Sequence, residues 1–301
     1  MDLARRVKSL IPVSARSRFA PIVYRKDLSR LAEYYWTDKW GQHWYMQHYQ
    51  RYFAPLRTAR INLLEIGVGG YDNIKSGARS LRVWKRFFPN ARIVGIDIYD
   101  KTELNEPRID IRVCDQTDGA ALKRLSDEYG GFDIIIDDGS HINEHVMKTF
   151  QVLFPLLRDN GIYAIEDTQT SYWPSYGGGL ERTDTQMAFF KNLTDGLNYV
   201  EYPIEEYVPS YFDRNIVEIA FFHNLVIIRK GSNTEPASSP DLVRDEIESL
   251  QREVIQESQC QGHTTPASSF LQETRPALHE RVFLSERNVP RRSPCVNRAE
   301  R

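Results

Sequence analysis

The sequence predicts an α/β fold, with a mostly parallel, doubly wound sheet of seven strands and an antiparallel last hairpin. Short apolar runs alternate with helical patterns over much of the chain, as they do when each strand is followed by a helix. Several of these runs end in glycines or carboxylates, as buried parallel strands do where ligands bind at their C-terminal edge. The last two runs are separated only by His223 and Asn224, so they are expected to pair as a hairpin.

The strands are expected where apolar, partly β-branched runs are bounded by turn residues. They cover residues 61–66, 92–98, 109–114, 132–136, 161–165, 216–222 and 225–229. Helices are expected where apolar residues recur at helical spacing, and Pro89 and the turn Asp159-Asn160-Gly161 mark two expected breaks. They cover residues 81–88, 120–129, 146–157 and 185–197.

The composition is that of an ordinary globular protein and bounds the function. The 301 residues are 41% hydrophobic and 27% charged, with a formal net charge of −2. This near-neutral balance argues against a nucleic-acid binder that depends on phosphate contacts. The three cysteines are far apart, so no disulfide framework or zinc cluster is expected, and a reducing cytoplasm fits best. No stretch reaches the roughly 18–20 apolar residues of a membrane span, and no signal peptide is expected.

Changes in composition divide the chain into three parts. Residues 1–58 begin with a basic stretch, which fits an arm or a frayed terminus equally, and continue into an aromatic helical segment expected to act as a lid and oligomer contact. Residues 59–234 hold all the expected strands. Residues 235–301 are rich in polar residues and are expected to be a disordered tail, in which only residues 242–255 carry the thin apolar stripe of a helix.

The first strand leads into a glycine turn, Gly67-Val68-Gly69-Gly70. Glycines here let the backbone approach a ligand closely, and the pattern alone fits dinucleotides and nucleosides equally. A dinucleotide-binding turn would have a third glycine where Asp72 stands, which makes a pyrophosphate site less favourable. Acids beside the glycines would repel phosphate and suit a cationic ligand such as S-adenosylmethionine. Glu65, Gly67 and Gly69 are therefore candidate cofactor-binding residues.

Carboxylates and an amide follow the next two strands. Asp97 ends the second strand about 30 residues after the glycine turn, where an acid typically binds ribose hydroxyls. A solvated strand end is the alternative for this residue. Asp115 and Gln116 follow the third strand, beside which the adenine of such a ligand would lie, and are candidates to bind its exocyclic amine. Asp118 is expected to cap the helix that follows.

Two acidic clusters end the fourth and fifth strands, Asp137-Asp138-Gly139-Ser140-His141 and Glu166-Asp167. If these strands are neighbours, Asp138, Glu166 and Asp167 converge, and like charges so close require a cation between them. His141 would lie beside the metal as a candidate base. The alternative is a helix cap, a surface histidine and a solvated turn, which would leave the order of acids and glycines at five strand ends to chance. The arrangement favours a metal-dependent methyltransferase.

Two segments are candidate walls of a substrate pocket. Residues 34–49 combine aromatic rings with polar tips and predict a lid or wall, with simple packing on the domain as the alternative. Residues 168–179 form a polar, glycine-ended loop at the ligand edge, which is either a substrate loop or a flexible connection. The candidate substrate-binding residues are Tyr45, Tyr49, Thr168 and Gln169.

Several short motifs occur together between about residue 28 and residue 234. They are Thr37-Asp38-Lys39-Trp40-Gly41, Leu64-Glu65-Ile66-Gly67-Val68-Gly69-Gly70-Tyr71, Gly95-Ile96-Asp97-Ile98-Tyr99-Asp100-Lys101, Asp115-Gln116-Thr117-Asp118, Asp137-Asp138-Gly139-Ser140-His141 and Ile165-Glu166-Asp167. This set resembles the macrocin- and mycinamicin-type sugar O-methyltransferases. The resemblance implies a Rossmann-like class I methyltransferase domain over residues 59–234. It also implies S-adenosylmethionine and Mg2+ as cofactors, and Asp137 is a further candidate for the cofactor site.

The resemblance also implies roles for individual residues. The metal ligands of the family map to Asp138, Glu166 and Asp167, and its base maps to His141. Family members form tetramers in which an N-terminal segment reaches a neighbouring active site, so a homo-oligomer is expected. The expected substrate is a small-molecule glycoside or glycan. Trp36 stands where the family has a glycine before Thr-Asp-Lys, which points to a lid shaped for another acceptor.

Other functions are compatible with the same residues. An enzyme of the same fold acting on a catechol or another non-sugar vicinal diol would chelate the metal identically, and only the loop of residues 168–179 would distinguish it. A non-catalytic S-adenosylmethionine-binding subunit has no need for His141 and the three acids, whose presence argues against it. A metal-independent NAD enzyme is least favoured, because the third glycine is absent.

Overall fold

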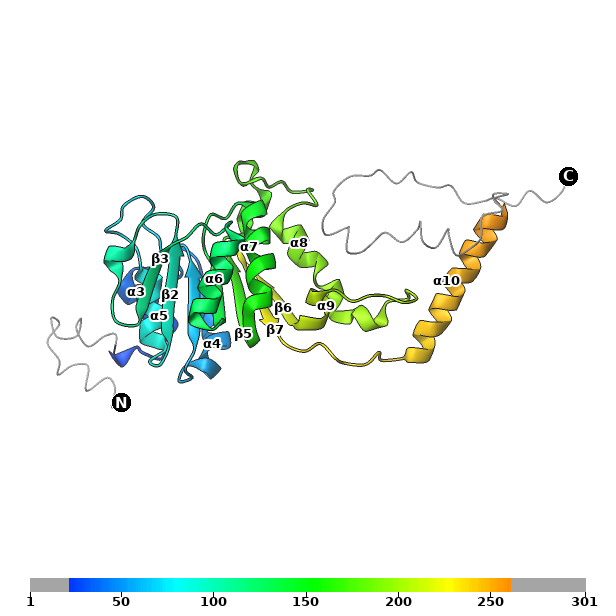
Figure 1. Cartoon of the computed structure of the whole chain (residues 1–301), viewed down its shortest axis with the longest axis horizontal. Helices are drawn as coiled ribbons and strands as arrows, with labels where there is room; N and C mark the ends of the chain where they lie inside the picture. Colours follow the sequence, from blue (N-terminus) through cyan, green and yellow to red (C-terminus); the bar gives the residue numbers. More distant parts are fainter. Residues whose placement is uncertain (1–21, 261–301) are drawn as a thin grey trace. The chain divides into compact units, whose positions relative to one another are not determined.

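A seven-stranded sheet with the order β3-β2-β1-β4-β5-β7-β6 organises the computed structural model, which describes residues 22–260 (Figure 1). β1 to β5 run parallel, β7 pairs antiparallel with β5, and β6 pairs antiparallel with β7. The strands are β1 (Asn62–Ile66), β2 (Arg92–Asp97), β3 (Ile109–Val113), β4 (Phe132–Asp137), β5 (Leu157–Glu166), β6 (Ile216–Phe222) and β7 (Leu225–Lys230). The predicted α/β class, the seven strands and the antiparallel hairpin are confirmed.

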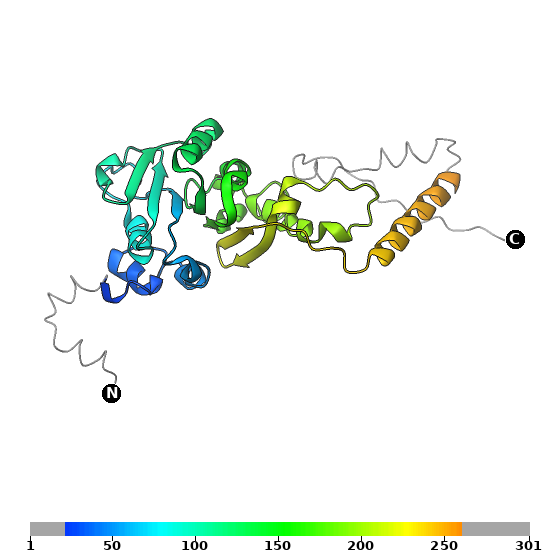
Figure 2. The same cartoon turned by 60° about the horizontal axis from the view of Figure 1, so that its bottom comes forward.

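Helices cover both faces of the sheet (Figures 1 and 2). On one face, α3, α4 and α5 pack with apolar side chains of the strands into the main core, which includes the fully buried Trp84. On the other face lie α6 and α7. The helices around the sheet are α3 (Leu28–Tyr35), α4 (Met46–Phe53), α5 (Arg79–Phe87), α6 (Gly119–Tyr129), α7 (Asn143–Leu156), α8 (Gln186–Asn192) and α9 (Tyr211–Asn215). Short 3₁₀ helices are η1 (Ala54–Leu56), η2 (Thr102–Leu104), η3 (Thr168–Tyr172), η4 (Pro174–Tyr176) and η5 (Asp195–Glu201).

The local sequence explains where α6 begins and ends. Asp118 Oδ1 accepts hydrogen bonds from the backbone of Ala120 and Ala121, both at 3.0 Å, and so satisfies N–H groups that the helix itself leaves free. Gly130 ends the helix in the left-handed conformation, with φ of 68°. The predicted capping role of Asp118 is therefore confirmed.

The turn predicted at Asp159-Asn160-Gly161 is wrong, because these residues lie inside β5. The pairing of β5 with β4 shifts register between Phe132 and Ile134, and the turn residues form this irregularity. Asn160 has a left-handed φ of 62°, a conformation that asparagine tolerates better than most residues. The predicted turn residues therefore interrupt the pairing of the strand rather than precede it.

Two helical segments are divided in the structure. The helix predicted over residues 185–197 ends at Asn192, and a 3₁₀ helix follows in which Asn198 has non-helical angles (φ −114°, ψ 24°). The aromatic segment forms α3 and α4 with a connecting loop between them. Trp36 ends α3 with a left-handed φ of 58°, so the chain turns there and carries the following loop to the edge of the sheet.

The chain divides into two compact units, Met1–Tyr202 with Glu206–Ser238 and Pro203–Glu205 with Ser239–Arg301. The first unit contains the sheet. In the second, α10 (Pro240–Cys260) includes the stretch of residues 242–255 for which the sequence predicts a helix. The expected disorder of the remaining tail concerns residues 261–301, which lie outside the described residues, as does the basic arm of residues 1–21.

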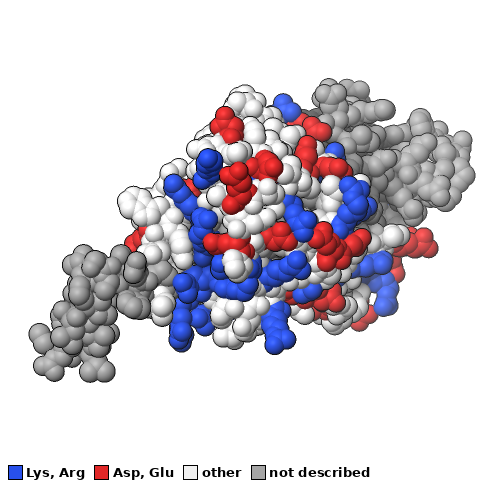
Figure 3. All heavy atoms as spheres, turned by 60° about the vertical axis from the view of Figure 1, so that its left-hand side comes forward, with Lys and Arg blue, Asp and Glu red and all other residues white. Residues whose placement is uncertain are grey.

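The described surface carries mixed charge. Figure 3 shows basic and acidic side chains next to one another on the face it presents. Arg112 and Glu128, for example, form an ion pair with a distance of 2.8 Å between Nη2 and Oε1. Within residues 22–260, no helix has the length and apolar character needed to cross a membrane.

Candidate functional site

The ends of β1, β4 and β5 lie side by side at one edge of the sheet. β4 pairs in parallel with both neighbours, and Asp137 lies opposite Ile66 on one side and Ile165 on the other. The chain therefore carries Asp138 just beyond the end of β4 and Asp167 just beyond the end of β5. The predicted adjacency of the two acidic clusters is confirmed.

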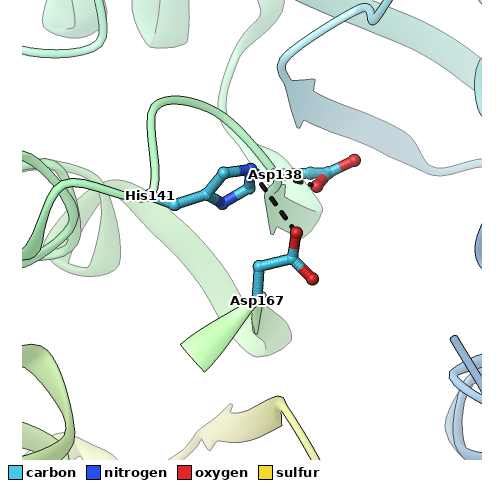
Figure 4. Close-up of side chains that lie close together, drawn as sticks. All are labelled: Asp138, His141 and Asp167. Atoms are coloured by element: carbon cyan, nitrogen blue, oxygen red, sulfur yellow. Dashed lines mark ion pairs between the residues drawn. The ribbon is translucent and has the colours of Figure 1, made fainter. Parts of the chain in front are cut away.

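Asp138, His141 and Asp167 converge at this edge (Figure 4). One potential ligand atom from each lies within 4.8 Å of the others. His141 Nε2 is 3.9 Å from Asp138 Oδ1 and 3.7 Å from Asp167 Oδ2. Carboxylate oxygens are the ligands that Mg2+ prefers, so this donor set fits a divalent cation. The imidazole faces both carboxylates and is placed to accept a proton from a group bound between them.

The backbone is strained at two of these residues. His141 has φ of 56° and Asp167 has φ of 53°, in the left-handed region that residues other than glycine rarely adopt. Such conformations persist only where the surrounding structure fixes them, and they cluster at functional sites. In this conformation both side chains face the space beside Asp138 (Figure 4).

Glu166 is bonded on both of its oxygens. Oε1 accepts a hydrogen bond from Tyr49 Oη at 2.6 Å, and Oε2 accepts one from Lys39 Nζ at 2.6 Å. Lys39 Nζ also lies 2.5 Å from Asp138 Oδ2 and 3.4 Å from Glu65 Oε1. Burial raises the pKa of Glu166, while the three carboxylates raise the pKa of Lys39 well above its usual value in spite of its burial. Because each oxygen already accepts one hydrogen bond, a metal bound to Glu166 would share an oxygen with Lys39 or Tyr49 or take it from them.

Tyr45 and His43 contact Asp167 from the segment before α4. Tyr45 Oη donates to Asp167 Oδ1 at 2.7 Å, and His43 Nδ1 lies 3.7 Å from the same oxygen. Partial burial acts to raise the pKa of Asp167, but the bond from Tyr45 and the nearby imidazoles outweigh it and lower this pKa. Tyr45 and Tyr49 are 1% and 0% exposed and line neither cavity described below. Both hydroxyls therefore hold carboxylates of the site, and contact with a substrate stays a prediction.

A cavity of about 500 Å³ opens beside the cluster. The glycine turn and the ends of β2 and β3 form one part of its wall, and the acidic edge forms the other. The predicted residues on this wall are Gly67, Gly69, Asp97, Gln116, Asp138, His141 and Asp167. The candidate base, two candidate metal ligands and four candidate cofactor-binding residues thus share one space.

Gly67 brings the glycine turn against the end of β4. Its φ is 90°, and a Cβ built there would lie 2.0 Å from the backbone oxygen of Asp138. Gly69 has φ of 77°, but a Cβ there would meet nothing within 4 Å. The close approach at Gly67 therefore requires glycine, whereas Gly69 requires it only for its backbone angle.

Gly67→Ala is expected to destabilise the fold by about 2–5 kcal/mol, because left-handed strain and a clash with backbone act together. Thermal unfolding measures the loss. Gly69→Ala, in the same turn, carries the strain without the clash and is the matched control, expected to cost only about 1–2 kcal/mol. Equal losses in the two variants would contradict the close contact with Asp138.

Asp97 and Gln116 hold neighbouring segments of the cavity wall in contact through hydrogen bonds. Asp97 Oδ2 accepts from Val68 N at 2.9 Å, and Oδ1 accepts from Tyr99 N at 3.0 Å, so this acid holds the glycine turn against the end of β2. Gln116 is buried, and its Oε1 accepts from Ser140 N at 2.7 Å. Both side chains lie on the wall where the ribose and the adenine of a nucleoside are expected.

Three predicted cofactor-binding residues line neither of the two cavities, two of them because they are buried and the third, Asp115, although it is exposed. Glu65 is fully buried and accepts a hydrogen bond from Trp84 Nε1 at 2.8 Å, and burial raises its pKa to about 7. Asp137 is 1% exposed, and burial likewise raises its pKa to about 7. Asp115 accepts a hydrogen bond from Thr117 N at 2.7 Å. Direct contact of these three side chains with a cofactor stays a prediction.

Only part of the loop after β5 reaches the cavity. Thr168 is 1% exposed, and its N–H donates to Asn224 O at 3.3 Å. Neither Thr168 nor Gln169 lines a cavity, whereas Tyr176 of the same loop lies on the wall of the 500 Å³ cavity. The loop therefore reaches the site as predicted, through a residue that the sequence analysis does not single out.

A second cavity, of about 650 Å³, lies between the loop that follows α3 and the glycine turn. Trp36, 79% exposed, lines it together with Lys39. Asp38 and Asp138 lie on the walls of both cavities. The segment between α3 and α4 is thus part of the site, and the sequence analysis gave no individual role to its Lys39.

Comparisons with known proteins agree with the site. No protein-family model matches the chain. The chain is 44% identical over 231 residues to mycinamicin VI 2''-O-methyltransferase of Micromonospora griseorubida, covering 75% of this chain and 58% of that protein. It is 45% identical over 216 residues to demethylmacrocin O-methyltransferase of Streptomyces fradiae, covering 70% of this chain and 55% of that protein. The chain therefore spans little more than half the length of these curated relatives.

Solved structures extend the likeness to the fold. The MycE methyltransferase from the mycinamycin biosynthetic pathway, in complex with Mg, SAH and mycinamycin VI, is 39% identical with a TM-score of 0.71, over 83% of this chain and 67% of that one. Another MycE structure, with Mg and SAH, is 44% identical with a TM-score of 0.68, over 70% of this chain and 55% of that one. The chain belongs to the family of macrocin- and mycinamicin-type sugar O-methyltransferases and has their class I methyltransferase fold.

Proposed function

We propose that the protein is a Mg2+-dependent O-methyltransferase that moves the methyl group of S-adenosylmethionine to a sugar hydroxyl of a glycosylated natural product or glycan. The position of Asp138, His141 and Asp167 on the wall of the cavity beside the glycine turn carries this proposal. The two carboxylates that would bind the metal and the histidine that would act as the base line the same cavity in which the cofactor would bind. A relative from Streptomyces olivaceus is named as an O-methyltransferase of a rhamnosyl tetracenomycin, which supports a sugar as the acceptor.

Asp138, Glu166 and Asp167 would hold the metal. Asp138 and Asp167 lie close together at the site, and Glu166, which now accepts a bond from Lys39, would be the third ligand. The ion, when bound, supplies a Lewis acid that lowers the pKa of a coordinated hydroxyl. The carboxylates also fix the direction from which that hydroxyl approaches the methyl group.

His141 would act as the base. Its Nε2 faces the carboxylates and would take the proton of the sugar hydroxyl. The hydroxyl oxygen forms a bond to the methyl carbon while the bond from that carbon to sulfur breaks. The electron pair of the broken bond stays on sulfur, so the sulfonium becomes a neutral thioether.

The cofactor would lie across the carboxyl edge of β1, β2 and β3. Gly67 and Gly69 allow its close approach, Asp97 would bind the ribose, and Gln116 lies where the adenine would be. Glu65 and Asp137 are proposed to shape the wall from behind, and the exposed Asp115 is proposed to reach the cofactor when it binds.

The acceptor would enter between the N-terminal segment and the loop after β5. The proposed substrate-binding residues are Tyr45, Tyr49, Thr168 and Gln169, of which both tyrosines act at least through the carboxylates that they hold. We further propose a homo-oligomer in the cytoplasm. Residues 1–58 would form its lid and contact segment, residues 59–234 the methyltransferase domain, and residues 235–301 a tail.

Calorimetry and product analysis test the proposal together. S-adenosylmethionine titrated into the protein is expected to bind in the presence of either Mg2+ or EDTA. A methylated product is expected from a diol-bearing glycoside only with Mg2+, and a catechol offered in parallel distinguishes a sugar acceptor from a non-sugar diol. Absence of cofactor binding under both conditions would refute the methyltransferase function, whereas binding without transfer would indicate a non-catalytic subunit.

A further inference from the structure

Lys39 places a fixed positive charge inside the acidic edge. It is 1% exposed, and the three N–H bonds of its ammonium face three carboxylates, those of Glu166 at 2.6 Å, Asp138 at 2.5 Å and Glu65 at 3.4 Å. These acids come from the ends of three neighbouring strands. One side chain from the segment between α3 and α4 therefore neutralises part of the charge that three strands bring together.

The same oxygens are the ones that a metal would use. Lys39 occupies Oδ2 of Asp138, so Oδ1 alone remains directed at His141. Lys39 and Tyr49 together occupy both oxygens of Glu166. A divalent cation that binds Oε2 of Glu166 or Oδ2 of Asp138 competes with the ammonium for that oxygen, whereas Oε1 of Glu166 is held by Tyr49.

Charge repulsion between the ammonium of Lys39 and a divalent cation would also weaken metal binding. A single and a double positive charge a few ångströms apart repel strongly, and more so where protein rather than water surrounds them. Lys39 is only 1% exposed, so little water lies against its charge to screen it. The ammonium should therefore weaken metal binding by charge as well as by occupying ligands.

We propose that Lys39 competes with the divalent cation for Asp138 and Glu166 and thereby sets the metal affinity of the site. Lys39 is therefore a positioning residue. It would hold Asp138 and Glu166 in place in the metal-free protein and release their oxygens when a metal ion binds. The inference rests on the proposed metal-dependent function. It predicts weak metal binding to the free protein and tighter binding without Lys39.

Metal affinity itself, measured by calorimetric titration with Mg2+, is the readout. Lys39→Gln is expected to lower the Mg2+ dissociation constant by about tenfold or more, because the competing charge is gone. The double variant Lys39→Gln with Glu65→Gln removes one buried charge of each sign, so it frees the ligand oxygens at unchanged net charge and is expected to show a smaller gain in the same direction. It keeps the test valid if the single variant does not fold.

Lys230→Gln is the matched control. Lys230 is also buried, at 5% exposure, but its ammonium donates to the backbone oxygens of Pro155 and Leu157 at 2.9 and 2.6 Å. Its loss should lower stability without changing the Mg2+ dissociation constant. A gain in affinity in this control would show that loosening of the fold, not loss of competition, is responsible, and would overturn the inference.

Two other outcomes separate the inference from the function on which it rests. If the natural protein binds Mg2+ and the folded Lys39 variants bind it equally or more weakly, Lys39 is a structural counterion and the competition is refuted, while the metal-dependent function stands. If the natural protein binds no Mg2+ at millimolar concentration, with or without S-adenosylmethionine, the metal site and the inference both fail.

Discussion

His141→Ala is expected to slow methyl transfer by about 10²–10⁴-fold, the usual contribution of a positioned general base. The imidazole faces Asp138 and Asp167 at 3.9 and 3.7 Å, so its removal leaves the bound hydroxyl with its proton. Binding of S-adenosylmethionine should change little, because the glycine turn and Asp97 are untouched. Single-turnover rates with saturating Mg2+ measure the effect on the chemical step.

The left-handed backbone at His141 calls for a second variant. Alanine at φ of 56° is strained, whereas asparagine tolerates this region. His141→Asn should therefore lose as much activity as His141→Ala while keeping more of the stability. A loss in the alanine variant alone would assign the effect to the backbone and contradict a role as base.

Two other histidines serve as controls. His48 stacks on Phe222 with ring centroids 3.8 Å apart and lines neither cavity, so His48→Ala should keep its turnover rate. His43 is the sharper comparison, since it lies 3.7 Å from Asp167 on the cavity wall. If His43→Ala loses the larger factor and His141→Ala the smaller one, the roles of these two histidines are exchanged.

The sequence predicted the sheet well because its signals are local. Each strand was an apolar run with a clear end, and Asp118 was recognisable as a cap from its place before a helical pattern. The acidic ends of β4 and β5 could be joined in advance because parallel strands meet at one edge. Within the cluster, the convergence of Asp138 and Asp167 followed from this topology alone.

The partners of the site were harder to predict because they depend on packing between distant segments. Lys39 is 99 residues from Asp138 and 127 from Glu166 in the sequence, and no periodicity connects them. Its place in the motif Thr37-Asp38-Lys39-Trp40-Gly41 gives no indication of which strand ends its ammonium reaches. Tyr45 and Tyr49 were expected at the substrate, but their hydroxyls reach carboxylates across similar separations, 122 and 117 residues.

Asp167→Asn is expected to reduce the Mg2+-dependent turnover by about 10²–10⁴-fold, because it weakens the hold on an ion that stabilises the transition state by several kcal/mol, and about 1.4 kcal/mol corresponds to tenfold. Asparagine suits the left-handed φ of 53° at this position, so the backbone should remain in place. Its amide oxygen can still accept the hydrogen bond from Tyr45, which the natural acid accepts at 2.7 Å. The substitution therefore removes charge with little change of shape.

Mg2+ titrations of activity and of binding distinguish the roles of Asp167. If it is a metal ligand, the variant should need more Mg2+ for half-maximal rate, while its affinity for S-adenosylmethionine measured in EDTA stays that of the natural protein. Asp184→Asn, which neutralises an exposed acid paired with Arg182, controls for the change of net charge and should behave as the natural protein does. An unchanged Mg2+ requirement in Asp167→Asn would place the ion elsewhere. The carboxylate would then serve only to orient His141, and the loss of rate would persist at every Mg2+ concentration.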